Sequence, residues 1–527
     1  MNKTEMKRLI KIEERIYEIA RDFGLEFCDI EFDVIPDQKM LEIMAYRIPS
    51  NISNWKFGRD YEKLRTYQEA VSNNLPLEVV LNTDPSRAYL MKDNVLSVQA
   101  MVMAHVVGHV AFFTMNRYFQ NTSKDVIQIL SEASKRFEKY ETLYGIDEIE
   151  RTIDAGHAIQ FHSSPFDLET ESEKRERIFE QTKQMEQSQG RSEFDDIAPS
   201  LKVDPNVDIE LFNQRLWKSL RQTTPVEPTE DLLRYIIDNS TNIEDWQKDV
   251  LEILRREGQY FWPQMKTKYM NEGFATYWHE KIMKQLFLEG YLDKTDHAQY
   301  NVSNSLVKAE NPFSLNPYMV GCGMWHNIVN RWDKGRHGND WNDCNDVKTK
   351  EAWDTGDMKG HEKMFEVLRT YTDWMFMKNF LTADVVDDLN LYIYIIKDMG
   401  MTEDVIITRQ DAEKVAKLIT ESFTHSHIPK IEIVDGNFHQ KNYLLMKHRW
   451  AGANLLKNYT KKTLQHIAYL WGKNTYLESR VNKDKKILYK IERKPIGIRN
   501  APKPDSGAKP KENIGSDFWS TSLKIEN

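Results

Sequence analysis

Apolar residues recur at helical spacing, three and four positions apart, over most of the first 390 residues. Residues 1–25 predict an amphipathic helix, and the stretch 95–162 predicts three consecutive helices, the first of which carries His105 and His109. The helical pattern resumes near Pro228 and continues to about residue 290. The pattern therefore predicts a body built mainly of helices.

The pattern changes past residue 390, where short runs of β-branched and aromatic residues replace the helical spacing. The segments with strand composition are LYIYII, DVIIT, KIEIVDG and NYLLMKH, and two helical stretches lie between and after them. Such a mixture is typical of a small α+β domain. We therefore predict a mainly α fold with a smaller C-terminal α+β part, and a helical body that carries a pocket lined by His and Glu.

The composition along the chain suggests a division into five segments. They are an N-terminal helical region (1–166), a charged connector (167–200), a second helical region (201–390) with a polar surface insertion at 333–362, a small α+β domain (391–480) and a Lys/Pro-rich tail (481–527). The tail is predicted to be disordered because Pro, Gly and Lys dominate its sequence.

The overall composition excludes several classes of protein. A net charge of −9 argues against binding of nucleic acid, and 40% hydrophobic residues in a chain of 527 support a sizeable core. Three cysteines without a CxxC pair are typical of a reducing interior. We see no signal peptide and predict no membrane span, so the expected location is the cytoplasm.

Two histidines stand four residues apart in the apolar segment AHVVGHVAFF. One helical turn brings His105 and His109 onto the same face, where two ring nitrogens can bind a single metal ion. Glu272, in KYMNEGFATYWHEKI, is the candidate third ligand, and His279 follows it two turns later on about the same face. We predict a site for one divalent ion, with zinc favoured over manganese or iron.

The segment NEGFA resembles the one in which zinc aminopeptidases of the thermolysin-like class place their glutamate ligand, after a helix with the pattern HExxH. Val106 occupies the position of that helix's glutamate, which serves as general base. A hydrolase built on these residues therefore needs a base from elsewhere. The catalytic candidates are Glu132, His157 and His279.

Other interpretations of these residues stay open. Asp154 and His157 are three residues apart. With Glu132, Glu272 and the histidine pair of the apolar segment, they would form the carboxylate–histidine cluster of a di-iron or di-manganese bundle. Alternatively, the histidine pair is hydrogen-bonded in a polar pocket. In that interpretation Glu272 faces the helix dipole behind an Asn271 cap.

Signatures of nucleotide-dependent and serine-nucleophile chemistry are absent from the sequence, which contains no GxGxxG after a strand, no GxxxxGK[ST] and no GxSxG. Cys322 precedes His326 by four residues and is a weak candidate for a nucleophile beside a base.

Several segments, in their order along the chain, resemble the SpoVR family, named after stage V sporulation protein R. The segments are NWKFGRDYEK, NTDPSRAYLMKDN, AHVVGHVAFF, YGIDEIERTIDAGHAIQ, YFWPQMKTKYMNEGFATYWHEKI, NPYMVGCGMWHNI, TYTDWMFMKNFLT and TLQHIAYLWG, which span roughly residues 50–480. The resemblance maps the family's histidine–glycine–histidine segment to His105, Gly108 and His109. Its asparagine–glutamate–glycine segment maps to Asn271, Glu272 and Gly273.

The resemblance implies a cytoplasmic, sporulation- or stress-associated protein that acts in spore cortex or envelope formation. It also implies two partners, a serine protein kinase of the PrkA type and a von Willebrand factor A-like protein. Two hypotheses follow. The first is a metal-dependent hydrolase of amide or peptidoglycan-related substrates, and the second is a non-enzymatic adaptor or regulatory partner of that kinase.

Overall fold

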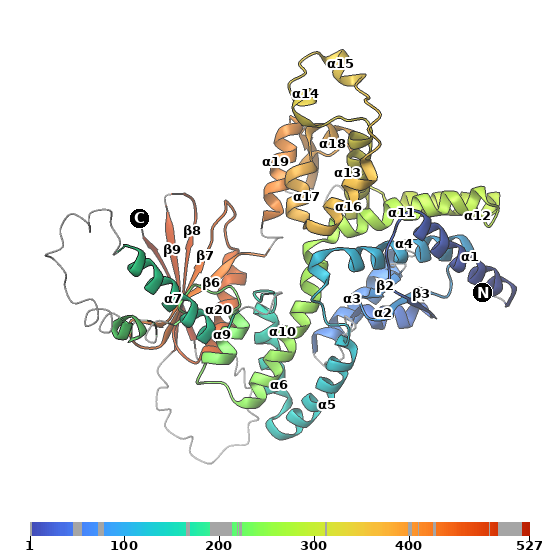
Figure 1. Cartoon of the computed structure of the whole chain (residues 1–527). Coiled ribbons are helices and arrows are strands. Elements are labelled where there is room, and N and C mark those ends of the chain that lie inside the picture. The colour runs from blue at the N-terminus through green and yellow to red at the C-terminus, as the bar shows by residue number, and fades with distance from the viewer. Residues whose placement is uncertain are drawn as a thin grey trace. The chain divides into compact units, whose positions relative to one another are not determined.

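A computed structural model describes most of the chain. The described residues are 3–45, 55–71, 78–164, 169–189, 213–218, 220, 224–310, 314–398, 403–408, 411–424, 428–483, 485–493 and 519–526. They confirm a mainly helical protein with a smaller C-terminal part that contains a sheet (Figure 1).

The chain forms two compact units, each made of two separated segments. Unit 1 combines Met1–Glu138 with Tyr260–His427, and unit 2 combines Lys139–Gln259 with Ile428–Asn527. The predicted divisions run consecutively along the chain, whereas the units do not, because helices distant in sequence share one core. The segment 391–480, predicted as a single domain, contributes strands to both units.

Unit 1 is a helical body with a small sheet near its N-terminus. Its elements are α1 (Lys3–Asp22), β1 (Ile30–Ile35), α2 (Asp37–Ala45), α3 (Trp55–Val71), β2 (Glu78–Leu81), β3 (Ser86–Met91), α4 (Leu96–Met115), η1 (Arg117–Phe119), most of α5 (Val126–Tyr144), the end of α10 (Asp245–Lys266), α11 (Lys268–Leu288), α12 (Lys294–Val307), α13 (Pro317–Asp333), α14 (Gly338–Asn342), α15 (Val347–Glu351), α16 (Gly360–Thr370), α17 (Asp373–Phe380), α18 (Ala383–Asp388), β4 (Ile393–Asp398), β5 (Glu403–Thr408) and α19 (Ala412–Ser422). The N-terminal sheet has the order β1-β3-β2, with β1 parallel and β2 antiparallel to β3.

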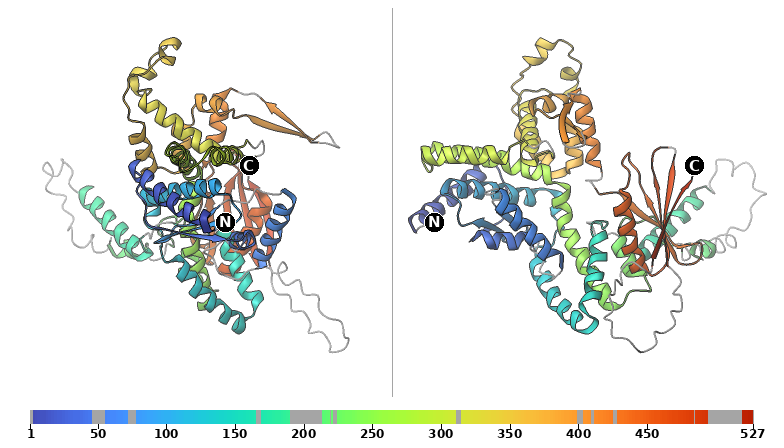
Figure 2. Two further views of the ribbon diagram at one scale, coloured as in Figure 1. Left: turned by 90° about the vertical axis from the view of Figure 1, so that its right-hand side faces the viewer. Right: turned by 180° about the vertical axis from the view of Figure 1, so that it is seen from behind.

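Two parts of unit 1 project from its helices. The short helices α14 and α15 lie in the predicted polar insertion and extend beyond α13 and α16 (Figure 1). The hairpin of β4 and β5 extends from the helices around α19 (Figure 2).

Helix α4 lies in the core of unit 1 and is apolar on all sides. Of the described helices it alone is long and apolar enough to span a membrane, but 94% of that window is buried inside the protein. Buried apolar residues from α1, α11, α13 and α16 belong to the same hydrophobic cluster. A helix covered on every side has no need of a polar face, so the buried histidines on α4 require a partner from the protein or a ligand.

Glycines allow three core helices to approach one another very closely. A Cβ atom at Gly108 of α4 would lie 2.6 Å from the Cα atom of Ala275 in α11. A Cβ atom at Gly273 of α11 would lie 2.2 Å from the carbonyl carbon of Gly321 in α13. Real Cβ atoms do not make such contacts with a backbone, so these positions have room only for hydrogen.

Unit 2 contains a five-stranded sheet and several helices. Its elements are α6 (Ile146–Ile159), α7 (Glu171–Gln189), α9 (Leu232–Asn239), most of α10, β6 (Ile431–Phe438), β7 (Tyr443–His448), α20 (Lys457–Trp471), β8 (Thr475–Arg480), β9 (Lys486–Arg493) and β10 (Trp519–Glu526). The strand order is β10-β9-β8-β7-β6, and apolar residues of α20 and α9 belong to one core with those of the sheet. Figure 1 shows both helices beside the sheet.

The predicted disordered tail contains two strands of this sheet. In β9 the side chains of Ile487, Tyr489 and Ile491 are buried while their neighbours are less so, a period-two pattern typical of a strand. β10 pairs with β9 in antiparallel register. The prediction of disorder is therefore wrong for these strands, because the Pro- and Lys-rich composition of 494–518, which lies outside the described residues, dominated the pattern. The charged connector contains the helix α7.

Replacing Gly321 by Ala tests the close contact between α11 and α13. The new Cβ atom would lie 2.1 Å from the carbonyl oxygen of Tyr269 and 2.8 Å from the Cα atom of Gly273. We expect Gly321→Ala to lower the free energy of unfolding by about 1–3 kcal/mol in urea denaturation followed by fluorescence. Gly58→Ala in α3 is the control, because nothing lies within 4 Å of its Cβ position. The control should be neutral or slightly stabilising, and equal stability of the two variants would contradict the contact.

Candidate metal centre

His105 and His109 lie one turn apart on α4, with ring centroids 4.5 Å apart. Both are buried, with 4% and 6% of their surface exposed. Since α4 is packed on every side, neither ring can turn to solvent. The helical spacing thus fixes two imidazoles beside one another in the core of unit 1.

Helix α11 brings a carboxylate to these rings. The Oε2 atom of Glu272 lies 3.5 Å from Nε2 of His105 and 3.4 Å from Nε2 of His109. The three predicted ligands therefore converge. The contact between Gly108 and Ala275 explains this convergence, because it brings α4 and α11 close enough for the side chain of Glu272 to reach both rings.

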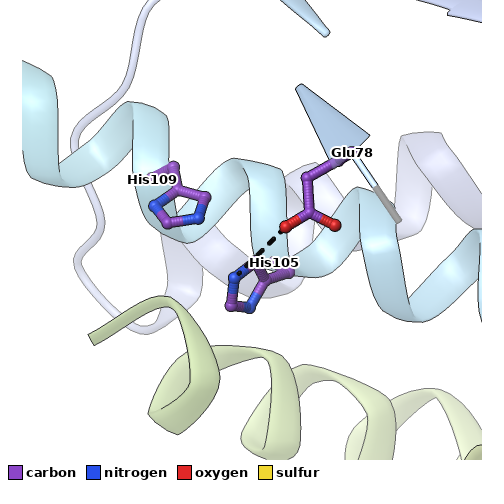
Figure 3. A group of neighbouring side chains, drawn as sticks. All are labelled: Glu78, His105 and His109. Atoms are coloured by element: carbon purple, nitrogen blue, oxygen red, sulfur yellow. Dashed lines mark ion pairs between the residues drawn. The ribbon is translucent and has the colours of Figure 1, made fainter. Parts of the chain in front are cut away.

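A second carboxylate reaches the same place from the edge strand β2. The Oε1 atom of Glu78 lies 3.6 Å from Nε2 of His105, as Figure 3 shows. The ligand atoms of Glu78, His105 and His109 all lie within 4.8 Å of one another, as donors around a metal ion do. We refer to Glu78, His105, His109 and Glu272 as the buried cluster.

Hydrogen bonds on the far side of each ring fix its tautomer. His109 donates from Nδ1 to Oδ1 of Asn271 at 2.9 Å. His279 donates from Nε2 to Oδ1 of Asn304 at 2.9 Å, so its Nδ1 accepts from Nδ1 of His105 at 3.0 Å. In the neutral rings, His105 and His109 then both direct an Nε2 lone pair toward the carboxylates.

The separations within the buried cluster fit a metal ion better than hydrogen bonds. N–H···O bonds are about 2.7–3.2 Å long, shorter than the 3.4–3.6 Å contacts here. In a tetrahedral zinc site with ligand distances of about 2.0–2.2 Å, ligand atoms are about 3.3–3.6 Å apart. In agreement, Nε2 of His105 and Oε2 of Glu272 are buried and have no hydrogen-bond partner among the described residues.

The titratable groups of the buried cluster shift one another's pKa values. Burial raises the pKa of Glu78, and the nearby histidines only partly oppose this effect. Burial alone would raise the pKa of Glu272 as well, but His105 and His109 outweigh it and hold that pKa well below its usual range. Burial lowers the pKa of His109, whereas the carboxylates of Glu272 and Glu78 raise it overall.

Tyr318 of α13 lies beside the buried cluster. Its ring centroid lies 5.8 Å from that of His105. Burial, followed by the charges of Glu272 and Glu78, raises the pKa of its phenol, which therefore stays protonated and can donate a hydrogen bond.

The structure places the remaining catalytic candidates differently. His279 is buried and touches the buried cluster through His105. Glu132 is exposed on α5 and accepts a hydrogen bond from Gln128. His157 belongs to unit 2, where its Nε2 lies 3.7 Å from Glu257. The buried cluster therefore draws its carboxylates from β2 and α11 and not from α5 or α6.

The alternative interpretation of Glu272 as a residue near a helix start does not describe its position. Helix α11 begins at Lys268 with Thr267 as its N-cap, so Glu272 lies a full turn inside the helix. The expected cap, Asn271, instead accepts a hydrogen bond from His109. The α11 N-terminus is bound by Asp373, which accepts from the backbone N–H groups of Tyr269 and Met270 at 2.9 Å.

The thiol of Cys322 lies closest to an acidic side chain, with His326 nearby. The thiol is 3.9 Å from Glu280, and His326 lies 3.4 Å from the same carboxylate. Burial, together with the charge of Glu280, raises the pKa of the Cys322 thiol. A nucleophilic cysteine needs the opposite shift, so this environment disfavours the nucleophile hypothesis.

Glu78, Tyr318, Asn304 and Glu280 contribute to the site or its surroundings but were not predicted. Glu78 carries a weak signal in retrospect, because it is a charged residue opening the apolar strand EVVL. Tyr318 lies within the segment NPYMVGCGMWHNI that carries the family resemblance. Asn304 and Glu280 have no sequence signal, since their role depends on contacts between helices.

Comparisons with known proteins agree with the resemblance seen in the sequence. A family model described as "SpoVR like protein" matches residues 3–428, and one described as "SpoVR-like C-terminal domain" matches residues 429–482. The chain is 25% identical over 509 residues to the "Uncharacterized protein YcgB" of Escherichia coli (strain K12), which covers 92% of this chain and 93% of that protein. No solved structure matches.

Neutral His279 should make the stability of the metal-free protein depend on pH. Burial, and then the electrostatic influence of the neighbouring His105 ring, lowers the pKa of His279 to about 3 from 6.5. The unfolded chain binds this proton near pH 6.5, whereas the folded protein resists it until about pH 3. Stability is therefore lost as pH falls through this window, by at most about 1.4 kcal/mol per pH unit.

We expect the free energy of unfolding of metal-free wild type to fall more steeply between pH 6.5 and 4 than that of His279→Gln, as measured by urea denaturation at each pH. A glutamine can donate and accept but does not titrate in this range. Identical slopes would show that His279 is not held neutral.

Proposed function

This chain belongs to the SpoVR family, and on that premise we propose that the buried cluster holds one divalent metal ion and hydrolyses amide bonds. The observation that carries the proposal is the convergence of the Nε2 atoms of His105 and His109 on the carboxylate of Glu272. Burying these donors together with two carboxylates costs free energy unless a cation neutralises the negative charge.

The proposed ligands are His105, His109 and Glu272, and zinc is the favoured metal. Two imidazoles and one carboxylate are a common ligand set of catalytic zinc, which keeps a further position for water or substrate. Manganese and iron accept the same donors and are the alternatives. The chemistry that such an ion supplies is Lewis acidity and a bound water of lowered pKa.

Glu78 is proposed as the general base that the sequence lacks at Val106. Its carboxylate extends from β2 to His105. Burial raises the pKa of Glu78, so its carboxylate accepts a proton more readily than that of an exposed glutamate. The protonated phenol of Tyr318 is proposed to donate a hydrogen bond to the oxygen on which negative charge develops. In this scheme His279 orients His105, and Glu132 and His157 have no role in the reaction.

The proposed substrates are amide bonds of peptidoglycan-related peptides, and the proposed setting is formation of the spore cortex or envelope. Family membership supports this setting, and the residues of the buried cluster support the reaction class. The alternative proposal is a non-enzymatic adaptor for a PrkA-type kinase, with a von Willebrand factor A-like protein as a second partner. Val106 favours the adaptor, because α4 itself lacks a catalytic glutamate.

The metal content of purified protein tests the proposed ligands. We expect about one equivalent of zinc, manganese or iron in untagged wild type, measured by inductively coupled plasma mass spectrometry. Glu272→Ala and His109→Ala should lose it, because each removes one of three ligands.

Glu132→Ala is the control for this measurement, since Glu132 is exposed and bonded to Gln128. The control should keep the metal, and circular dichroism should show that all variants are folded. Folded wild type without metal would contradict the proposal and favour the adaptor. Metal retained in Glu272→Ala would refute the ligand assignment.

Glu78→Gln separates the base from the ligands. Glutamine has nearly the same shape but cannot take the proton, so we expect hydrolysis of peptidoglycan-derived peptides to fall by about 10²–10⁴-fold with the metal content unchanged. Hydrolysis is followed by mass spectrometry of the products. Loss of the metal in this variant would make Glu78 a ligand, and full activity would assign the base elsewhere.

A further inference from the structure

A chain of hydrogen bonds leads from the buried cluster to a second polar group on α11 and α12. His279 donates from Nε2 to Oδ1 of Asn304, and Nδ2 of Asn304 donates to Oε1 of Glu280, both at 2.9 Å. Lys308, which caps the C-terminal end of α12, donates to the same oxygen at 2.5 Å. The chain therefore runs from Glu280 through Asn304 and His279 to His105.

The chain of hydrogen bonds has only one possible polarity while Glu280 is ionised. A carboxylate only accepts, so the amide of Asn304 must present its NH₂ to Glu280 and its oxygen to His279. His279 then carries its hydrogen on Nε2, and its Nδ1 must accept from His105. In a neutral His105 ring the Nε2 atom is left without hydrogen, and it faces the carboxylates of the buried cluster.

Glu280 is held in its ionised form by its neighbours. Burial raises the pKa of Glu280, but hydrogen bonds from His326, Asn304 and Lys308 outweigh burial and lower it strongly. The carboxylate keeps about 20% of its side-chain surface exposed and stays in contact with Lys308. It is thus a permanent acceptor at the outer end of the chain.

We propose that Glu280 is a positioning residue that sets the tautomer of His105 through Asn304 and His279. In doing so it keeps the Nε2 lone pair of His105 directed at the buried cluster. The role needs no change of charge in any member of the chain. It rests on the proposed function, because the oriented lone pair is the one assigned to the metal.

The same carboxylate also lies near two potential ligands, since donor atoms of Glu280, Cys322 and His326 are within 4.8 Å of one another. The Nζ atom of Lys308 already supplies a positive charge to Glu280. A second metal ion would be repelled by that ammonium group. We therefore assign Glu280 to the hydrogen-bond chain and not to a metal site of its own.

Glu280→Gln tests this role through metal affinity. A glutamine can donate to Asn304 as well as accept, so the amide can turn and the chain can reverse until His105 carries its hydrogen on Nε2. We expect zinc to bind this variant about 10–100-fold more weakly than wild type, measured by competition with a chromophoric chelator. Glu289→Gln is the matched control, because Glu289 is also ion-paired, to Arg15, but lies outside the hydrogen-bond chain. Its zinc affinity should equal that of wild type.

A second substitution should restore the polarity. In Glu280→Gln/Asn304→Asp the carboxylate introduced on α12 can only accept from His279, and the amide introduced on α11 donates to that carboxylate. We expect zinc affinity to return toward the wild-type value in this double variant. A double variant that binds zinc as weakly as Glu280→Gln would contradict the assigned polarity of the hydrogen bonds.

The tautomer itself is measured by ¹⁵N NMR of histidine-labelled, metal-free protein, with the His105 signal assigned by its loss in His105→Gln. Wild type should carry the hydrogen on Nδ1, and Glu280→Gln should move it to Nε2. An unchanged tautomer, or zinc affinity equal to that of wild type in folded Glu280→Gln, would overturn the inference. Wild type that binds no zinc contradicts the proposed function, while the tautomer measurement still decides the role of Glu280.

Discussion

The buried cluster depends on close backbone contacts between helices, at positions where only glycine fits. Gly108 lies against Ala275, and Gly273 against Gly321, so α4, α11 and α13 touch at points where a Cβ atom has no space. Glu272 precedes Gly273 in the chain, and Gly108 lies between His105 and His109 on α4. Because the close approach is fixed by backbone rather than by flexible side chains, the ring nitrogens and the Glu272 carboxylate meet with little freedom to move apart. The geometry of the site therefore follows from the packing of the core.

Within this rigid setting, hydrogen bonds decide what each donor atom can bind. Asn271 fixes the ring of His109, and the chain from Glu280 fixes that of His105. Metal-ligating histidines usually have such a partner on the other nitrogen, which settles the tautomer and the ring plane. The two supports differ, since one is a single amide and the other a chain ending in an ion pair. An effect on His105 can thus originate at the surface, whereas His109 is held from within the core.

The sequence predicted the elements that follow a regular period, and it missed those that depend on tertiary contacts. The histidines on α4 were identified because four residues make one helical turn, and Glu272 because of its surrounding segment. Glu78 was missed because no spacing relates a strand residue to a helix that starts 18 positions later (96 − 78). The same holds for Asn304, on another helix from His279. The tail was misjudged for a different reason: β9 has a clear alternating pattern, but the surrounding Pro- and Lys-rich segments outweighed it.

The position of Glu78 changes what the missing glutamate on α4 implies. Read along the helix alone, Val106 argues against hydrolysis, because the usual pattern supplies ligands and base from one helix. The chemistry, however, requires only a carboxylate near the ligands, whichever element carries it. The edge strand β2 runs beside α4 and places Glu78 next to His105. A base supplied by a strand is oriented independently of the ligand helix, so the ligands and the base of such a site can vary separately in sequence while the arrangement in space is kept.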